Sequence, residues 1–222
     1  MKGRNGLTHR PNLLTLRPNL WFQCYWVLYL VWFFALDRLV TTPKYILHSL
    51  LDDRIPFCEW FIFPYCSWFF LLVGVTALLW WYDTPSYNKL CLMMFSGMTF
   101  CLIVYMILPN GVDLRPAAEQ IGRDNLGMQI MRLIWKADSS NNVCPSIHCQ
   151  SSGCMALAFS RSRLAEHRPW LKALAWGWAG LICLSTLFTK QHSVIDVACG
   201  LALTAVWYWP LYGRSAKRRT AG

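Results

Sequence analysis

Several apolar runs in this sequence are long enough to cross a lipid bilayer, and they limit the possible folds more than any other feature. A helix needs about 20 apolar residues to span the hydrocarbon core. The runs occupy residues 20–40, 57–82, 87–108, 146–160, 170–188 and 193–212, and the short fourth run is expected to cross by tilting or by being shielded. A soluble bundle would carry polar residues at regular intervals in each run, and these runs lack them. The sequence therefore predicts an all-α, polytopic membrane helical bundle with six transmembrane helices.

The segments between the runs define the rest of the organisation. Residues 41–56 contain Asp52, Asp53 and Arg54 and are expected to form an outer loop or a helix in the membrane interface. Residues 83–89 predict a short turn and 161–172 a basic loop. Residues 109–144 form a long polar stretch with an amphipathic helix expected near 117–136.

These boundaries predict one six-span domain, residues 20–212, with its catalytic motifs within 109–196. A basic cytoplasmic N-terminal segment (1–19) and a basic cytoplasmic tail (213–222) flank it. The first apolar run lacks a clear cleavage site, so we expect it to stay as a membrane anchor.

The formal net charge of +10 would suit a nucleic-acid-binding protein, but its distribution argues against that class. Most basic residues cluster beside apolar runs, as the cytoplasmic anchors of membrane proteins do. With six spans, one side collects four Lys and Arg from the N-terminal segment, Lys89, four from 161–172 and four from the tail. The other side collects the remaining 8 of the 21. This bias predicts cytoplasmic termini and places Arg115, His148 and His192 on the non-cytoplasmic face, with the plasma membrane as the expected location.

Ten cysteines are spread singly through the chain without a CxxC pair, and most are expected to be small buried residues. Cys58 with Cys66, or Cys144 with Cys149, could form disulfides in an oxidising compartment, and the sequence leaves this open. Cys144, His148 and Cys149 are also soft metal ligands, but their spacing matches no familiar zinc motif. We therefore expect neither a metal nor another cofactor.

The first candidate site residues are Ser146 and His148, which follow Pro145 where a polar loop enters an apolar run. Proline is favoured in the first turn of a helix, so the spacing predicts that both side chains project from that turn. Free backbone N–H groups and the helix dipole there would bind an anion. The alternative is an ordinary helix cap with a bystander histidine.

The second candidate pair is His192 and Asp196, whose spacing places them on one face of the last helix. A carboxylate that accepts the Nδ1 proton would leave Nε2 with a free lone pair, as a nucleophile requires. The alternative is a structural pair at a helix start. Lys190 and Arg115 are expected to supply positive charge for phosphate oxygens, although a loop arginine is more often simply solvated.

Together these residues resemble three signatures of the type 2 phosphatidate phosphatase / vanadium haloperoxidase superfamily over about residues 85–212. The matching motifs are Arg115-Pro116, Pro145-Ser146-Ile147-His148 and Ser185-x6-His192-x3-Asp196. The family signatures read Lys-x6-Arg-Pro, Pro-Ser-Gly-His and Ser-Arg-x5-His-x3-Asp. This chain has Leu108, Ile147 and Thr186 where the family has Lys, Gly and Arg. Residues 142–148 and 188–192 resemble the branch that contains inositol phosphorylceramide synthases and sphingomyelin synthases.

The resemblance implies that His192 attacks phosphorus, that Asp196 orients it and that His148 protonates the leaving oxygen. Arg115 and Ser146 would hold the phosphoryl oxygens, with Lys190 as a partial substitute for the missing cations. The expected activity is metal-independent hydrolysis of a lipid phosphomonoester or diphosphate through a phosphohistidine. One alternative is a headgroup phosphotransferase that passes the phosphoryl group to a lipid alcohol. The other is a non-catalytic membrane protein that binds lipid.

Overall fold

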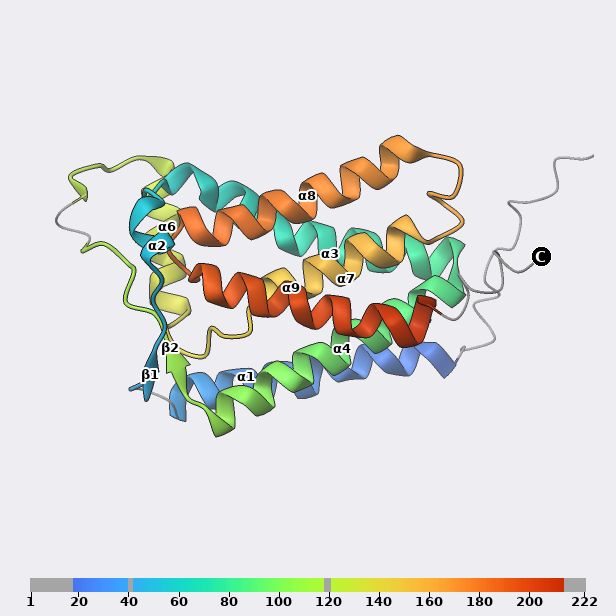
Figure 1. The fold of residues 1–222 in the computed structure, drawn as a ribbon, viewed down its shortest axis with the longest axis horizontal. Helices are drawn as coiled ribbons and strands as arrows, with labels where there is room; N and C mark the ends of the chain where they lie inside the picture. The colour runs from blue at the N-terminus through green and yellow to red at the C-terminus, as the bar shows by residue number, and fades with distance from the viewer. Residues whose placement is uncertain (1–17, 40–41, 118–120, 214–222) are drawn as a thin grey trace, which may run out of the picture.

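The computed structural model describes residues 18–39, 42–117 and 121–213, and these ranges form an all-α bundle (Figure 1). The predicted basic segments, residues 1–19 and 213–222, lie almost entirely outside the described residues. The elements in chain order are η1 (Pro18–Cys24), α1 (Tyr25–Leu39), β1 (Tyr45–Ile46), α2 (Leu50–Arg54), η2 (Glu59–Phe61), α3 (Ile62–Tyr82), α4 (Thr84–Ile107), β2 (Asn110–Gly111), α6 (Leu126–Ala137), α7 (Ile147–Ser160), α8 (Pro169–Phe188), α9 (Val194–Tyr208) and the π-helical η3 (Trp209–Gly213).

Among the described residues, four helical segments are long and apolar enough to cross a membrane: Glu59–Tyr82, Thr84–Ile107, Pro169–Phe188 and Val194–Tyr212. They confirm the predicted all-α class and indicate a multi-pass membrane protein. The other two predicted spans contain shorter α-helices, and for the fourth span the sequence had already predicted a short run. α1 has 15 residues and follows a 3-10 helix, and α7 has 14 residues.

The short helix α7 lies at the centre of the bundle, in contact with α3, α4, α8 and α9. Every residue of α7 except His148 is buried. α9 approaches the start of α7 very closely at Gly200, where an added Cβ would lie 2.5 Å from the carbonyl oxygen of Ser146. Because its neighbours cover α7, its length is not set by the thickness of a surrounding bilayer.

One prediction about a connecting segment is wrong, and another is confirmed over part of its range. The turn expected at 83–89 is instead the first part of α4. Asp83 caps this helix by accepting a hydrogen bond from the Ser86 N–H at 3.3 Å, and a proline occupies the first turn. The amphipathic helix expected near 117–136 is present as α6, Leu126–Ala137, at whose start the Asn125 side chain accepts from the Met128 N–H at 3.0 Å. Of this predicted range, residues 118–120 lie outside the described residues.

The described parts of the two longest polar connections, residues 40–61 and 108–146, lie at one end of the bundle (Figure 1). β1 pairs in parallel with β2, with Tyr45 opposite Asn110 and Ile46 opposite Gly111. α2, α6, β1 and β2 lie together on the left of Figure 1, whereas α1 begins and α9 ends at the opposite end. The segment predicted as an outer loop or interfacial helix, residues 41–56, contains the five-residue helix α2 and strand β1, with residues 40 and 41 not described. This end of the molecule carries the candidate site.

Candidate active site

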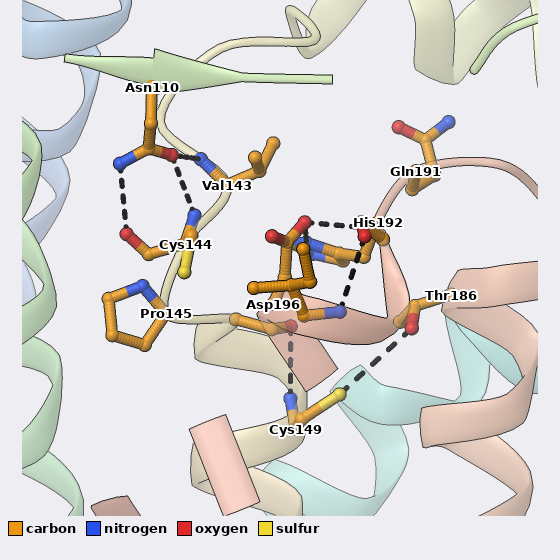
Figure 2. Close-up of polar contacts among 12 residues, drawn as sticks. Asn110, Val143, Cys144, Pro145, Cys149, Thr186, Gln191, His192 and Asp196 are labelled. Carbon is orange, nitrogen blue, oxygen red and sulfur yellow. Dashed lines mark hydrogen bonds and ion pairs between the residues drawn. The ribbon is translucent and has the colours of Figure 1, made fainter. Parts of the chain in front are cut away.

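His192 is held at the start of α9 by Asp196. Ser193 is the N-cap of this helix and forms a capping box with Asp196, whose Oδ2 accepts from the Ser193 N–H at 2.9 Å. The same oxygen lies 3.4 Å from His192 Nδ1 (Figure 2). Asp196 is fully buried, and its Oδ1 has no hydrogen-bond partner among the described residues. A proton on Nδ1 directed to Asp196 leaves the lone pair of Nε2 available for a reaction.

His148 lies opposite His192. Its ring packs against Tyr65 and Trp68, with centroid distances of 4.7 and 4.9 Å, and its centroid is 5.7 Å from that of His192. The two histidines that the sequence predicted to meet are therefore neighbours, although they come from different helices. The two rings meet edge to face, with an interplanar angle of 63°, and both line the same cavity.

The start of α7 differs from the prediction. Pro145 precedes the helix instead of occupying its first turn, and the Cys144–Pro145 peptide bond is cis. Ser146 is the N-cap, and its hydroxyl accepts from the Cys149 N–H at 3.4 Å. The Ser146 N–H donates to the carbonyl oxygen of Asp196 at 3.1 Å, which ties the two helix starts together. Ser146 is completely buried, so its hydroxyl serves the cap.

Asn110 holds the loop before α7 and was not identified from the sequence. Its Oδ1 accepts from the N–H groups of Val143 and Cys144 at 3.0 and 2.8 Å, and its Nδ2 donates to the Cys144 carbonyl at 3.0 Å (Figure 2). The Tyr105 hydroxyl donates to the Pro145 carbonyl at 2.6 Å. In the sequence, Asn110 follows the end of an apolar run, where an asparagine is usually an ordinary turn residue. Nothing in the sequence therefore marked it as a residue that holds this loop.

Arg115 reaches the site through Gln191. Its guanidinium donates to the carbonyl oxygens of Asp138 and Ser139 at 2.9 and 3.0 Å and to Gln191 Oε1 at 2.5 Å. Burial lowers the pKa of the guanidinium, and the nearby Asp138 carboxylate opposes this shift. An arginine pKa remains far above neutrality, so Arg115 carries a positive charge that polarises the Gln191 amide.

Two buried amides next to the histidines were also missed. Gln191 is 2% exposed and Asn142 is 6% exposed, and both line the same cavity as His148 and His192. Gln191 Nε2 and both polar side-chain atoms of Asn142 have no hydrogen-bond partner in the described part of the chain. Buried amide groups rarely remain unsatisfied, so each of these groups requires an explanation. A ligand in the cavity would supply the missing partners.

Lys190 faces away from this cavity and toward α2. The residue adopts a left-handed backbone conformation with φ of 56°, and its ammonium donates to the Asp52 carbonyl oxygen at 2.6 Å. Burial lowers its pKa, whereas Asp52 and Asp53 act in the opposite direction. Lys190 is therefore engaged in a contact that supports the loop before α9.

The Asp52 side chain forms the second part of this contact. It is 2% exposed, and its carboxylate accepts from the Ser193 hydroxyl at 2.6 Å and from the Val194 and Ser49 N–H groups at 2.8 Å. This buried carboxylate connects α2 directly to the start of α9. From the sequence, Asp52 could be assigned only to the segment 41–56 between two apolar runs. The sequence does not show that Asp52 contacts residues about 140 positions later in the chain.

The cavity around the histidines has a volume of about 470 Å³. Its polar end contains the histidines with Gln191, Asn142 and Asp138, and the rest is lined mainly by aromatic and aliphatic side chains of α1 and α3. Thr186, at the position of the family arginine, is completely buried and donates to the Cys183 carbonyl at 2.8 Å. The cavity thus combines a few polar groups at one end with a mainly apolar lining, as is typical of sites that bind small molecules.

Within the described residues, no group of three or more His, Cys, Asp or Glu side chains could hold a metal ion. All ten cysteines lie in the described ranges and are free, so neither suggested disulfide is formed. No protein-family model matches this chain, and no curated protein matches it. The resemblance to the phosphatase superfamily therefore rests on the three motifs.

Proposed function

We propose that this protein is an integral membrane enzyme that hydrolyses a lipid phosphomonoester or diphosphate without a metal, through a phosphohistidine on His192. The observation that carries the proposal is the pair of histidine rings, 5.7 Å apart at the end of an apolar cavity, with Asp196 beside His192 Nδ1. The motifs shared with the type 2 phosphatidate phosphatase superfamily support the same chemistry.

In the first step, His192 Nε2 attacks phosphorus and the bond to the leaving oxygen breaks. His148 donates a proton to that oxygen, and Asp196 stabilises the charge on His192. In the second step, His148 removes a proton from water, which attacks phosphorus and releases inorganic phosphate and neutral His192. The first step replaces a P–O bond by a P–N bond, and the second step replaces that P–N bond by a new P–O bond. One proton moves in each step.

The phosphoryl oxygens need donors that are already in place, because the transition state carries negative charge. The unpaired amides of Gln191 and Asn142 are suitably placed donors, and Arg115 adds positive charge through Gln191. We propose that these groups replace the Lys and Arg that the family has at Leu108 and Thr186. The contributions of Ser146 and Lys190 would then be to hold the two helix starts in position.

We propose that the chain crosses the membrane six times. η1 and α1 together form the first crossing, and α7 forms the fourth. Cytoplasmic termini would place the histidines on the non-cytoplasmic face, in agreement with the distribution of Lys and Arg along the chain. The lipid tail would then remain in the membrane while its phosphate reaches the polar end of the bundle.

A phosphotransferase is the second candidate, and the largely apolar wall of the cavity favours it. Such a wall limits access of water and would accept a lipid alcohol next to the phosphohistidine. The two reactions share the first step and differ in the acceptor of the phosphoryl group.

The test is a panel of lipid phosphates given to purified protein in detergent, with and without a lipid alcohol. Released phosphate measures hydrolysis, and a new phospholipid measures transfer. His192→Ala is expected to lower either activity by several orders of magnitude. The control variant His167→Ala removes an exposed histidine from the loop before α8 and should leave both activities unchanged. Equal activity of the two variants would refute His192 as the nucleophile, and no activity of the unmodified protein on any substrate of the panel would support a non-catalytic, lipid-binding role.

A further inference from the structure

A second cavity of about 470 Å³ adjoins the histidine cavity. It is lined by residues of η1, α1, α3 and α4, among them Gln23, Leu72, Thr76, Trp80 and Tyr87. Trp26 of α1 and Leu72 of α3 line both cavities, so the two spaces meet at these side chains. Together they form a groove between α1 and α3, which we call the α1–α3 groove.

The α1–α3 groove follows a single face of α3 over most of its length. The α3 residues that line it recur at helical spacing, at Tyr65, Trp68, Phe69, Leu72, Val73, Thr76, Ala77 and Trp80. From Tyr65, which packs on His148, to Trp80 the rise along the helix is about 22 Å. A bilayer leaflet contributes only about 15 Å, half of the hydrocarbon core. The groove is therefore longer than one leaflet.

Protein side chains leave the groove unfilled because α1 is attached to α4. The Tyr25 hydroxyl is 2.7 Å from Thr99 Oγ1, and the Tyr25 ring stacks on Phe95 with centroids 4.5 Å apart. Phe34 and Val73 line the groove and are still 52% and 67% exposed. The groove thus opens sideways toward the surrounding bilayer, which offers an entry path for a lipid.

Polar side chains mark the end of the groove that is far from the histidines. Gln23 Nε2 donates to the Tyr87 hydroxyl at 2.6 Å, and Gln23 Oε1 accepts from Trp26 Nε1 at 3.1 Å. These hydrogen bonds connect η1, α1 and α4 across the groove. A hydrocarbon chain that extends from the histidines would meet this polar cluster at its distal end.

We infer that the α1–α3 groove holds the tail of the substrate, which is a lipid phosphate with one hydrocarbon chain longer than a leaflet. This inference rests on the proposed function and deepens it by naming the substrate class. The phosphate lies at the polar end of the cavity, beside His148 and His192, and the chain runs past Leu72 toward Trp80. The groove is lined mainly by α1 and α3, and it continues directly from the cavity that contains the histidines. A lipid with two acyl chains leaves its second chain outside it.

The first test compares Ala77→Trp with Leu78→Trp. Ala77 lines the distal half of the groove, whereas Leu78 is exposed on α3 and is not among the lining residues. Both variants place the same large side chain in adjacent positions. Ala77→Trp is expected to lower kcat/KM for long single-chain lipid phosphates at least about tenfold, with less than about twofold change for short-chain ones. Leu78→Trp should change neither value. Equal effects of the two variants, or equal losses for short and long chains, would overturn the inference.

The second test is independent of turnover. A long single-chain lipid phosphate with a photoreactive group at its tail end is added to His192→Ala protein and cross-linked. Labelling is expected between residues 73 and 80 and is expected to disappear in a second protein that carries Ala77→Trp as well. Labelling at other residues contradicts the tail site. Phosphatidate that competes as well as the single-chain analogue contradicts the single-chain substrate. Correct labelling without any turnover of lipid phosphates by unmodified protein would preserve the tail site and refute the proposed function.

Discussion

The contact between α2 and the start of α9 predicts that Asp52→Asn disturbs His192 although the two side chains do not touch. The Asp52 carboxylate is buried and accepts three hydrogen bonds, from Ser193 Oγ and from the backbone N–H groups of Val194 and Ser49. Two of these donors directly follow His192 in the chain. The carboxylate therefore determines where the last helix begins.

The magnitude follows from the number of acceptors. Asparagine keeps the shape of aspartate but has one oxygen, so at least one of the three donors loses its acceptor. A buried donor without a partner costs about 1–3 kcal/mol, and we expect the free energy of unfolding to fall by about 2 kcal/mol. Displacement of a reacting group by about 1 Å can cost about a hundredfold in rate. We expect kcat to fall by about tenfold to a hundredfold.

Asp53→Asn is the matched control, because it removes the same charge from the next position of α2. Asp53 is exposed and pairs with the exposed His48 at 2.8 Å. A surface pair of this kind contributes less than about 1 kcal/mol. Thermal unfolding in detergent and turnover of a lipid phosphate would be measured for both variants. If Asp52→Asn behaves like Asp53→Asn in both assays, α2 does not position His192.

Three further predictions test packing, the amide donors and charge. Gly200→Ala should destabilise the fold by about 1–3 kcal/mol because its Cβ would collide with the α7 backbone, whereas Gly180→Ala, with open space around it, should stabilise α8 by about 0.5 kcal/mol in the same unfolding assay. Gln191→Ala should lower kcat/KM about a hundredfold by removing a phosphate donor, while Arg115 keeps two carbonyl acceptors and the Tm changes little; an unchanged kcat/KM would exclude the amide as a donor. Burial raises the pKa of the Asp138 carboxyl, so the folded state binds its proton more tightly than the unfolded chain does, and ionisation at neutral pH costs stability. Asp138→Asn should therefore raise the Tm at pH 7, and melting curves should show the gain disappearing as the pH falls below the ordinary pKa range of an aspartate carboxyl.

Features that depend only on residues close together in the chain could be predicted from the sequence. The apolar runs determine the all-α membrane class because an unpaired backbone cannot cross a bilayer, and an unbroken helix is the local solution. The pairing of His192 with Asp196 follows in the same way from helical spacing. The prediction for Pro145 failed because Ser146, one residue later, takes the N-cap.

The site itself required contacts between residues far apart in the chain. Asp52 and Ser193 are separated by 141 residues, Arg115 and Gln191 by 76, and Asn110 and Cys144 by 34. Periodicity shows which face of a helix is buried, but it does not show which helix covers that face. The order in which the helices pack around α7 decides these contacts, and with them the position of both imidazoles. The sequence alone thus determined a helical membrane protein with histidines at helix starts, and only the packing of the helices brought those starts together around one cavity.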